Sequence, residues 1–384
     1  MNNSIIIIAG EPSADMHGAA LVKELKTLNP ELRIYGIGSR LMEKAGVEIF
    51  TDLAQYAVIG FIEVLKHYSI FKKAFDLTLE KIKQIQPKAL ILIDYPGFNL
   101  RLAKKVKHLF PDVKIIYYIS PQVWAWGKKR IKLIEKIVDK MLVVFDFEAT
   151  LYNQHGIDAE FVGHPLMESV VLSENKAELI KAKGITPSDT IIALLPGSRQ
   201  IEVKRLLPVM LASADKLHQK MPAVRFVLIK AANIKPGTIE TYLNNYKHLA
   251  IEIITDHSYD FISICSYAWV CSGTATLETA ILGIPMLITY KTSFFTWFIS
   301  KLLIKLPYIG LVNVVARKKI VPEFIQGQSN KNNIVSCTIR FLNKNTAFKQ
   351  AQTQKLLAVK HKLGSGQVNK NAAQAILKTI NKKY

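Results

Sequence analysis

The sequence contains little cysteine and no apolar stretch long enough to cross a membrane. Its three cysteines among 384 residues are too few and too scattered for a disulfide framework, and no Cys-x-x-Cys pair indicates a structural zinc site. The apolar run at residues 5–9 is far shorter than the roughly 20 residues of a membrane-spanning helix, and it lacks the basic flank of a signal peptide. These absences favour a reducing, cytoplasmic compartment.

Acidic residues are scarce relative to basic ones. The chain has 51 Lys and Arg against 30 Asp and Glu, which gives a formal net charge of +21. Such an excess favours a polyanionic partner, such as nucleic acid, an anionic membrane or a phosphorylated substrate; a proteome rich in lysine is the alternative explanation. Because the lysines are dispersed and no helix-turn-helix, RRM or zinc motif appears, no nucleic-acid partner is expected.

Apolar, strand-like runs alternate with helical patterns along most of the chain. Continuous β-branched runs between helices are typical of parallel strands that are covered on both faces. The sequence therefore predicts an α/β fold with two Rossmann-like, doubly wound domains. The pair Gly36 and Gly38 is predicted to be a turn, since no third glycine completes a dinucleotide-binding fingerprint. The predicted strands are residues 5–9, 89–93, 115–119, 141–145, 190–195, 225–230, 251–255, 269–271 and 286–289.

The polar, charged stretch at residues 165–187 is the predicted hinge between the domains. A chain of this length usually holds two domains. We expect a first domain at residues 1–168, joined by the C-terminal segment 345–384, and a second at residues 169–344. Parallel sheets bind ligands at the carboxyl ends of their strands, so we expect a cleft between the two domains.

The loop at residues 10–18 is the first candidate site. It leaves a strand and enters a helix, so its backbone amides and the helix N-terminus can face a ligand. Glu11, Ser13, Asp15 and His17 lie in it. No Gly-Lys-Ser/Thr follows, which excludes a Walker A loop. The alternative interpretation is an ordinary strand-to-helix loop in which Asp15 caps the helix.

Asp94, at the end of a buried apolar run, is the second candidate. A carboxylate at such a place is costly unless it is solvated or hydrogen-bonded. The ends of strands that open onto a cleft are common places for catalytic carboxylates, so Asp94 is the candidate general base for transfer to a hydroxyl group. The alternative is that Asp94 caps the following helix.

Aromatic and basic residues are interleaved at residues 120–130. Trp124 and Trp126 stand beside a basic run, and isoleucines follow at helical spacing. This composition favours a surface for anionic or amphiphilic ligands. The alternative is that the tryptophans are core residues and the lysines line a solvated helix face.

Two loops in the second half indicate phosphate binding. Gly197 allows the backbone to approach a ligand closely, amides from Ser198 onward can hold phosphate oxygens, and Arg199 can bind them with two hydrogen bonds; a plain turn is the alternative. In the second loop, small residues open a helix and make a cradle for an anion, and a capping box with imperfect spacing is the alternative. The residues of this second loop are Ser272, Gly273, Thr274 and Glu278, the last placed to bond a ribose diol.

Taken together, six stretches resemble the lipid-A-disaccharide synthases: GEPSADMHGA, IDYPGFN, SPQVWAWGKKRI, FVGHPL, LPGSR and SGTATLE. They occur in this order, and a weaker match, Asn313 with Glu323, follows them. Ala14 and Gly97 depart from the usual pattern, which more often has Gly and Asp there. The resemblance implies the GT-B fold, and a reaction in which UDP-2,3-diacylglucosamine donates its sugar to 2,3-diacylglucosamine 1-phosphate (lipid X), with UDP as the second product.

The resemblance also implies roles for individual residues. Asp94 would be the catalytic base, Glu11 a nearby catalytic carboxylate and Arg199 a ligand of the UDP diphosphate. The other residues expected to bind substrate or nucleotide are Ser13, Asn99, Gly197, Ser198, Ser272, Gly273, Thr274, Glu278 and Asn313.

No metal ion and no other cofactor is expected. The Asp-x-Asp triplet that anchors a metal ion and a diphosphate in one glycosyltransferase class is absent, and Asp146-Phe147-Glu148 is its nearest imitation. Helix dipoles and arginine would then stabilise the leaving diphosphate.

Members of the family are peripheral enzymes of the inner membrane, and both substrates are acylated anions. The apolar segment 294–306 is the first candidate for membrane contact, through Phe295, Phe298, Lys301 and Lys305, and it would lie in the interface rather than span it. Residues 58–75 are a second candidate, and core helices are the alternative for both. The sequence leaves the oligomeric state open, including a homodimer.

Rival functions remain at this point. Another GT-B enzyme that uses a UDP-N-acetylglucosamine-type donor, either a transferase to a different lipid carrier or an epimerase, would share these loops. A nucleic-acid-binding protein is suggested by the net charge alone. A membrane scaffold would not need the two phosphate loops.

Overall fold

A computed structural model describes residues 3–53, 68–125, 127, 130–186, 189–293, 297 and 307–381. The chain forms two compact units. The first contains Met1–Met167 and Leu363–Tyr384, and the second contains Glu168–Lys362. The chain therefore leaves the first unit and returns to it close to the C-terminus.

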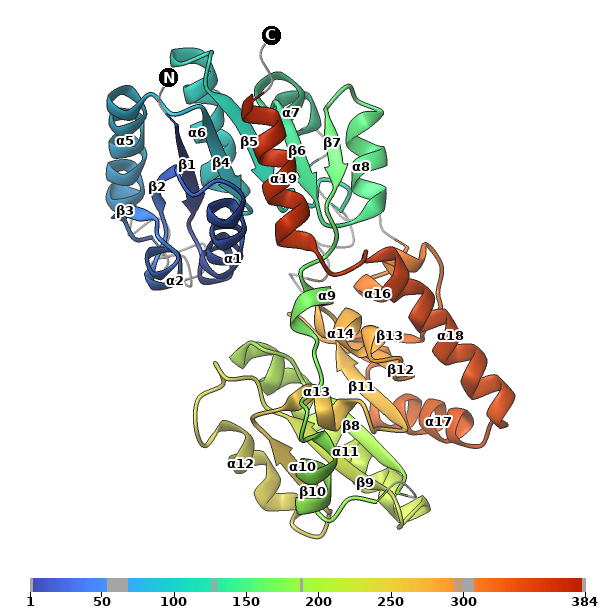
Figure 1. The fold of residues 1–384 in the computed structure, drawn as a ribbon. Helices are drawn as coiled ribbons and strands as arrows, with labels where there is room; N and C mark the ends of the chain where they lie inside the picture. The colour runs from blue at the N-terminus through green and yellow to red at the C-terminus, as the bar shows by residue number, and fades with distance from the viewer. Residues whose placement is uncertain are drawn as a thin grey trace. The chain divides into compact units, whose positions relative to one another are not determined.

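A parallel sheet forms the centre of the first unit (Figure 1). Its strands are β1 (Ser4–Ala9), β2 (Arg33–Ile37), β3 (Glu48–Thr51), β4 (Ala89–Ile93), β5 (Lys114–Tyr118), β6 (Lys140–Val143) and β7 (Ala159–Phe161). They lie in the order β3-β2-β1-β4-β5-β6-β7, and all pair in parallel. Every residue of β1 and β4 is buried, as expected of central strands covered on both faces.

Helices cover both faces of this sheet. They are α1 (Pro12–Leu28), α2 (Arg40–Lys44), α5 (Tyr68–Ile85), α6 (Pro96–Leu109), α7 (Ile131–Ile137), α8 (Asp146–Asn153) and α19 (Val368–Asn381). One buried cluster joins the sheet to α5, α6, α7 and α8, and another joins the opposite face to α1, α2 and α19. Proline at the first position of both α1 and α6 suits a helix start, because its φ is already helical and no amide is lost.

A second parallel sheet forms the centre of the second unit. Its strands are β8 (Ile191–Leu195), β9 (Arg225–Ile229), β10 (Ile251–Ile254), β11 (Tyr267–Cys271), β12 (Met286–Tyr290) and β13 (Glu323–Ile325). They lie in the order β10-β9-β8-β11-β12-β13, again all parallel. The predicted pair of doubly wound α/β units is therefore confirmed.

The helices of the second unit flank its sheet. α9 (Leu166–Ser169) spans the boundary between the two units. The helices that follow it are α10 (Lys176–Ala182), α11 (Gln200–Lys220), α12 (Thr238–Leu243), α13 (Ser258–Ile262), α14 (Ala275–Ile281), α16 (Leu311–Ala316), α17 (Lys331–Leu342) and α18 (Thr346–Lys362). Short 3-10 helices lie at Asn244–Tyr246 and Gln326–Gln328. α11 and α17 pack against each other on one face of the sheet. α14, α16 and α18 form a second group of helices that pack against one another. No helix among the described residues of the chain is both long and apolar enough to cross a bilayer.

The C-terminal segment 345–384 is divided between the two units rather than assigned to the first as expected. α18 packs against α14 and α16 of the second unit, and it buries Leu356 and Val359. α19 packs against α1 of the first unit. The return is held by hydrogen bonds from the His164 amide to the Leu363 carbonyl, at 2.8 Å, and from the Asn371 side chain to the Val162 carbonyl, at 3.1 Å.

The prediction of a turn at Gly36 and Gly38 is wrong for Gly36, which lies within β2. Gly36 pairs with Ile7 of β1. A Cβ atom on Gly36 would stand only 2.2 Å from the carbonyl oxygen of Ile7. Glycine is therefore required here because two strands approach closely, not because the chain turns. The sequence pattern alone does not distinguish these two uses of glycine.

We expect Gly36→Ala to lower the free energy of unfolding by about 3 kcal/mol or more, because the contact is with backbone that cannot rotate away. Chemical denaturation followed by circular dichroism measures the change. Gly327→Ala is the matched control, since a Cβ there meets nothing within 4 Å. Equal stability of both variants would show that β2 can shift away from β1 at little cost.

Candidate active site

The candidate site of the first unit lies where the strand order of its sheet reverses. β1 and β4 are neighbours in the sheet, and Ala9 is in register with Ile93. The loops that begin at Gly10 and Asp94 therefore leave the sheet side by side. Open parallel sheets bind ligands at such a switch point, outside the carboxyl ends of the strands. The first two loops singled out in the sequence thus start at one place.

The backbone of the Asp94 loop is strained. Asp94 and Tyr95 both have φ of 45°, and Ile119, at the end of the next strand, has φ of 59°. Such left-handed conformations cost on the order of 1 kcal/mol for each non-glycine residue. Hydrogen bonds to the Asp94 carbonyl oxygen hold the loop, from the Tyr117 hydroxyl at 2.5 Å and from the Asn99 side chain at 2.8 Å. Strain that is held in this way is concentrated at functional sites.

The carboxyl group of Asp94 has an environment suited to a base. Burial raises the pKa of Asp94, and a hydrogen bond from the Tyr95 amide opposes the rise. A carboxylate whose pKa is raised binds a proton more strongly, which makes it a better general base near neutral pH. The side chain remains partly accessible, so a substrate hydroxyl can reach it.

Glu11 lies near the Asp94 loop through Tyr95. Burial, and then the negative charge of Glu11, raises the pKa of the Tyr95 phenol. The Tyr95 ring covers Gly10, where a Cβ atom would stand 2.8 Å from it. Glu11 is the N-cap of α1, and Ser13 is exposed in the first turn of the helix. Sequence reasoning missed Tyr95, although it directly follows Asp94.

Two polar residues of these loops are structural. Asn99 was expected to bind substrate, but it is fully buried and donates to the carbonyl oxygens of Ile93 and Asp94. Its amide nitrogen holds the loop, whereas its Oδ1 is buried and has no hydrogen-bond partner. Asp15 caps α2 rather than α1, because its carboxylate accepts hydrogen bonds from the amides of Ser39, Leu41 and Met42.

A buried acid lies below the aromatic stretch that follows β5. The Trp124 indole donates to Glu148 Oε1 at 2.8 Å, and its ring contacts Phe145 and Phe147 edge-on. Trp124 is therefore packed against other aromatic side chains, although it is only partly buried. Trp126 lies outside the described residues, so the choice between a core and a surface role for the pair stays open. Burial raises the pKa of Glu148 to about 7, against the Trp124 hydrogen bond, and Oε2 of Glu148 has no hydrogen-bond partner.

Two histidines add a neutral pair at the carboxyl ends of this sheet. Burial lowers the pKa of His17. Burial, and then the charge of His17, lowers the pKa of His164 to about 4. His164 follows β7 and accepts a hydrogen bond from the Leu166 amide. Both side chains are therefore neutral at physiological pH and can act as hydrogen-bond partners rather than as cations.

The candidate site of the second unit lies at the corresponding switch point. β8 and β11 are neighbours, and Leu195 is in register with Val270. A Cβ atom on Gly197 would stand 3.3 Å from Sγ of Cys271, the last residue of β11, so the loop after β8 lies against the end of β11, where the second loop begins. Gly197 has φ of 118°, a conformation that a side chain would strain. The two predicted phosphate loops thus form one surface.

The helix amides of the first phosphate loop are occupied by the chain itself. Glu202 Oε2 accepts hydrogen bonds from the amides of Ser198 and Arg199, both at 3.1 Å. The Arg199 guanidinium bonds Glu202 Oε1 at 3.3 Å, yet 78% of the Arg199 side chain is exposed. A carboxylate of the chain thus accepts from the amides at which the sequence predicted phosphate oxygens, while most of the Arg199 side chain is exposed.

The second phosphate loop is open at its tip and buried at its base. Thr274 is exposed at the start of α14, whereas Ser272 donates to the Ile309 carbonyl at 3.0 Å. Burial raises the pKa of Glu278, and a hydrogen bond from the Thr274 side chain opposes the rise. Burial, and then the charge of Glu278, raises the pKa of Tyr259 to about 12. Tyr259, on α13, is a neighbour of this loop that the motif did not include.

Asn313 does not fit the predicted role of a nucleotide ligand. It is fully buried, and its Oδ1 accepts from the amides of Ile320 and Val321. Its Nδ2 donates to the Val321 carbonyl and to Glu323, at 2.8 Å for the latter. Every hydrogen-bonding position of the amide is used, so Asn313 fixes Glu323, whose carboxylate accepts from the Gly310 amide and caps α16.

The predicted membrane-contact residues, Phe295, Phe298, Lys301 and Lys305, lie outside the described residues, as does most of the second candidate segment, 58–75. Among the described residues, no three His, Cys, Asp or Glu side chains form a group that could hold a metal ion.

Two doubly wound parallel sheets, each with polar loops at its switch point, define the GT-B class of glycosyltransferases and related sugar-nucleotide enzymes. Solved structures of this class match the fold over nearly the whole chain. A Neisseria meningitidis UDP-GlcNAc 2-epimerase bound to UDP-GlcNAc has a TM-score of 0.62 at 11% identity, covering 98% of this chain and 100% of its own. A glycosyltransferase from Rickettsia africae has a TM-score of 0.57 at 14% identity, with 99% of each chain covered.

Sequence relatives identify the family. Residues 5–379 match the family described as lipid-A-disaccharide synthetase. A lipid-A-disaccharide synthase of Geobacter metallireducens is 40% identical, covering 100% of this chain and 98% of its own. Lipid-A-disaccharide synthase 1 of Legionella pneumophila (strain Philadelphia 1) is 41% identical, with 95% and 94% covered. The chain belongs to the lipid-A-disaccharide synthase family.

The raised pKa of Glu148 predicts a pH-dependent stability. The folded protein binds a proton at Glu148 up to about pH 7, whereas the unfolded chain releases it near its ordinary, lower pKa. Stability should therefore fall as pH rises between these two values, by about 3 kcal/mol in total. Glu148→Gln should remove this decline, as measured by urea denaturation from pH 4 to pH 8.

Glu43→Gln, at an exposed position on α2, is the control and should leave the pH profile unchanged. Parallel profiles for the wild type and Glu148→Gln would mean that Glu148 is ionised in the folded protein at neutral pH.

Proposed function

We propose that this chain catalyses an inverting transfer of 2,3-diacylglucosamine from its UDP derivative to 2,3-diacylglucosamine 1-phosphate. The products are a β-1,6-linked disaccharide 1-phosphate and UDP. The single observation that carries the proposal is identity of about 40% over the full length with lipid-A-disaccharide synthases. The strained, partly buried Asp94 at a switch point supports it, since the reaction needs a base beside a hydroxyl group.

Asp94 acts on the acceptor in this proposal. The Asp94 carboxylate takes the proton of the acceptor 6-hydroxyl as its oxygen attacks the anomeric carbon of the donor. The bond from that carbon to the UDP oxygen breaks, and UDP leaves with the electron pair. Glu11 lies near enough to raise the pKa of Tyr95 beside Asp94, so it belongs to the same polar surface as the base.

The UDP diphosphate binds at the paired loops of the second unit. Arg199 supplies an exposed guanidinium, and the small residues at the start of α14 leave room for an anion at a helix N-terminus. Binding requires the diphosphate to compete with Glu202 for the amides of Ser198 and Arg199. The leaving charge is stabilised by arginine and helix amides, with no metal ion and no other cofactor.

Both substrates carry acyl chains, so the enzyme must work at a bilayer surface. We propose peripheral association with the cytoplasmic face of the inner membrane, supported by the net charge of +21. An epimerase is not favoured: structures with that activity match at 11–13% identity, which reflects the shared fold alone.

Asp94→Asn should lower turnover by roughly 10²-fold or more, the scale expected for loss of a general base. The variant should fold normally, because asparagine tolerates a left-handed backbone better than most residues. Turnover is measured with acylated UDP-glucosamine and lipid X in detergent, with mass detection of the disaccharide. Asp112→Asn, on an exposed turn after α6, is the control. Turnover of Asp94→Asn within twofold of wild type would reject Asp94 as the base.

Arg199→Ala and Glu202→Gln should shift UDP affinity in opposite directions. Loss of the guanidinium should weaken binding by about 1.5–3 kcal/mol, the range for a hydrogen bond to a charged group. Neutralising Glu202 should tighten binding by about 1 kcal/mol, since it removes a like charge from the diphosphate site and keeps the helix cap. Calorimetry with UDP measures both changes.

Lys220→Ala, at the far end of α11, should leave UDP affinity unchanged. If all three variants bind UDP like the wild type, the nucleotide site must be sought away from these loops.

A further inference from the structure

The positive charge of the chain is concentrated in its last part. Residues 279–384 contain 17 Lys and Arg and a single acidic residue, Glu323, for a net charge of +16 out of +21. The preceding 278 residues are close to balanced, with a net charge of +5. The Glu323 carboxylate accepts hydrogen bonds from Asn313 and from a backbone amide. These bonds, rather than an ion pair with a nearby lysine, occupy it.

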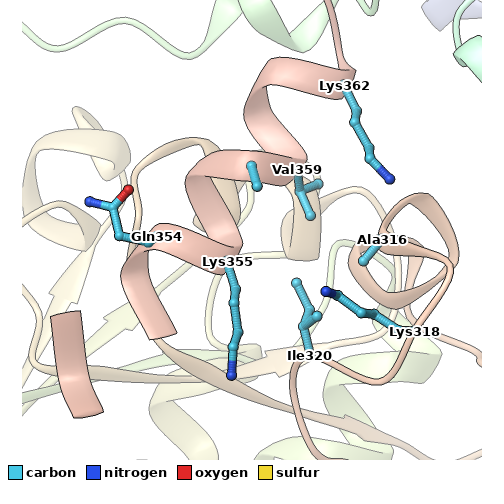
Figure 2. A pocket seen from close by; sticks show the side chains of 8 residues that line it. Ala316, Lys318, Ile320, Gln354, Lys355, Val359 and Lys362 are labelled. Carbon is cyan, nitrogen blue, oxygen red and sulfur yellow. The ribbon is translucent and has the colours of Figure 1, made fainter. Parts of the chain in front are cut away.

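A hollow of about 370 Å³ lies between α18 and the end of α16. We call it the α16 hollow. Figure 2 shows Lys318, Lys355 and Lys362 around it, from the turn after α16 and from α18. Its floor is apolar and includes the buried residues Ile320 and Val359. No acidic side chain of the described residues lines it.

A second hollow, of about 310 Å³, shares Ile320 with the first. We call it the α17 hollow. Its rim carries Lys319, Arg340 and Lys344, and its wall includes Phe348, which remains 44% exposed on α18. The Lys344 ammonium lies 5.5 Å from the centre of the Phe348 ring. No described acidic residue lines this hollow either.

The two hollows are separate from the nucleotide loops. Tyr267 and Met286, which line the α17 hollow, are the first residues of β11 and β12. The phosphate loop at Ser272 follows the last residue of β11. The five residues of β11 span roughly 16 Å, so the α17 hollow lies towards the amino ends of strands whose carboxyl ends carry the candidate site. The α16 hollow adjoins it at Ile320, and no residue of the two nucleotide loops lines either hollow.

An apolar floor with a cationic rim fits one kind of ligand, an anion with an apolar part. Lysine and arginine stems can lie along apolar surface while their charged ends meet phosphates. An exposed aromatic ring beside a cation is typical of side chains at the interface between water and lipid. A phospholipid headgroup in a bilayer offers phosphate and the start of acyl chains together, whereas free phosphate would leave the floor exposed to water.

We propose that the α16 and α17 hollows form a docking surface for anionic phospholipids at a bilayer surface, distinct from the site that holds the lipid substrates. The inference rests on the proposed function only in that the substrates are membrane lipids. The hollows and their charge stand independently of it. The surface lies on described residues and differs from the segments 294–306 and 58–75.

Flotation with vesicles tests the proposal. Wild-type protein should bind phosphatidylcholine vesicles that contain phosphatidylglycerol, bind pure phosphatidylcholine vesicles weakly, and be released by high salt. The triple variant Lys318→Glu, Lys344→Glu, Lys355→Glu should bind the anionic vesicles at least tenfold more weakly. All three side chains are exposed, so the variant should fold with the circular dichroism spectrum and melting temperature of the wild type.

A matched triple variant separates a defined surface from net charge. Lys220→Glu, Lys235→Glu, Lys247→Glu makes the same charge change at exposed positions elsewhere on the second unit. It should bind anionic vesicles within threefold of the wild type. Phe348→Ser, which changes no charge, should also weaken vesicle binding. Equal losses in both triple variants would overturn the proposal, as would a wild type that ignores anionic vesicles.

Two further measurements distinguish other outcomes. Turnover on detergent-dispersed substrates should remain within twofold of the wild type in both triple variants. A wild type that is inactive but still binds anionic vesicles would overturn the proposed function and leave the docking proposal standing. Release of the protein from vesicles by inorganic phosphate at matched ionic strength would assign the hollows to a free anion. Loss of RNA binding with unchanged vesicle binding in the first triple variant would assign them to nucleic acid. Either result overturns the lipid assignment.

Discussion

Parallel strand pairing is the constraint on which the rest of this structure depends. Parallel neighbours cannot be joined by a tight turn, so each crossover passes through a longer connection, usually a helix, that covers a face of the sheet. All carboxyl ends of the strands then lie on one edge. In both units the order of strands reverses once, between β1 and β4 and between β8 and β11, and the polar loops gather there. The positions of Asp94 and Arg199 follow from this geometry before any side-chain contact is considered.

The central strands were predictable because a strand that is buried on both faces appears in the sequence as a continuous apolar run. Runs such as β4 contain only apolar residues, and the predicted strands fall on observed ones. Strands β2, β3, β7 and β13 were not predicted. β2 has five residues, as many as β4, but it contains Gly36, which is required by the nearby carbonyl of Ile7. Contacts of that kind depend on the neighbouring strand, which a local pattern does not contain. The division of the C-terminal segment between α18 and α19 depends likewise on distant partners.

The loops of the candidate site were predictable as loops, but the duties of their polar residues were not. Asn99 and Asn313 look like ligands in a motif, yet both are buried and bond the backbone of their own surroundings. Glu202 shows the opposite case: an ordinary capping residue in sequence, it occupies the amides expected to hold phosphate. Hydrogen-bond partners decide between these roles, and residue type alone does not. Tyr95 is linked to the site by its ring against Gly10, by the effect of Glu11 on its pKa and by the strained backbone that it shares with Asp94.

The return of α19 to the first unit bears on how the protein is made. Ala372, Ala373 and Ile376 belong to the same buried cluster as Leu21 and Leu25 of α1, so α1 is covered by a helix that is translated only after the second unit. Domains generally fold in order from the N-terminus during synthesis, but here an apolar face of α1 must wait until the second unit has been translated. The nascent first unit therefore remains incomplete, with an apolar face of α1 uncovered, until α19 has been translated.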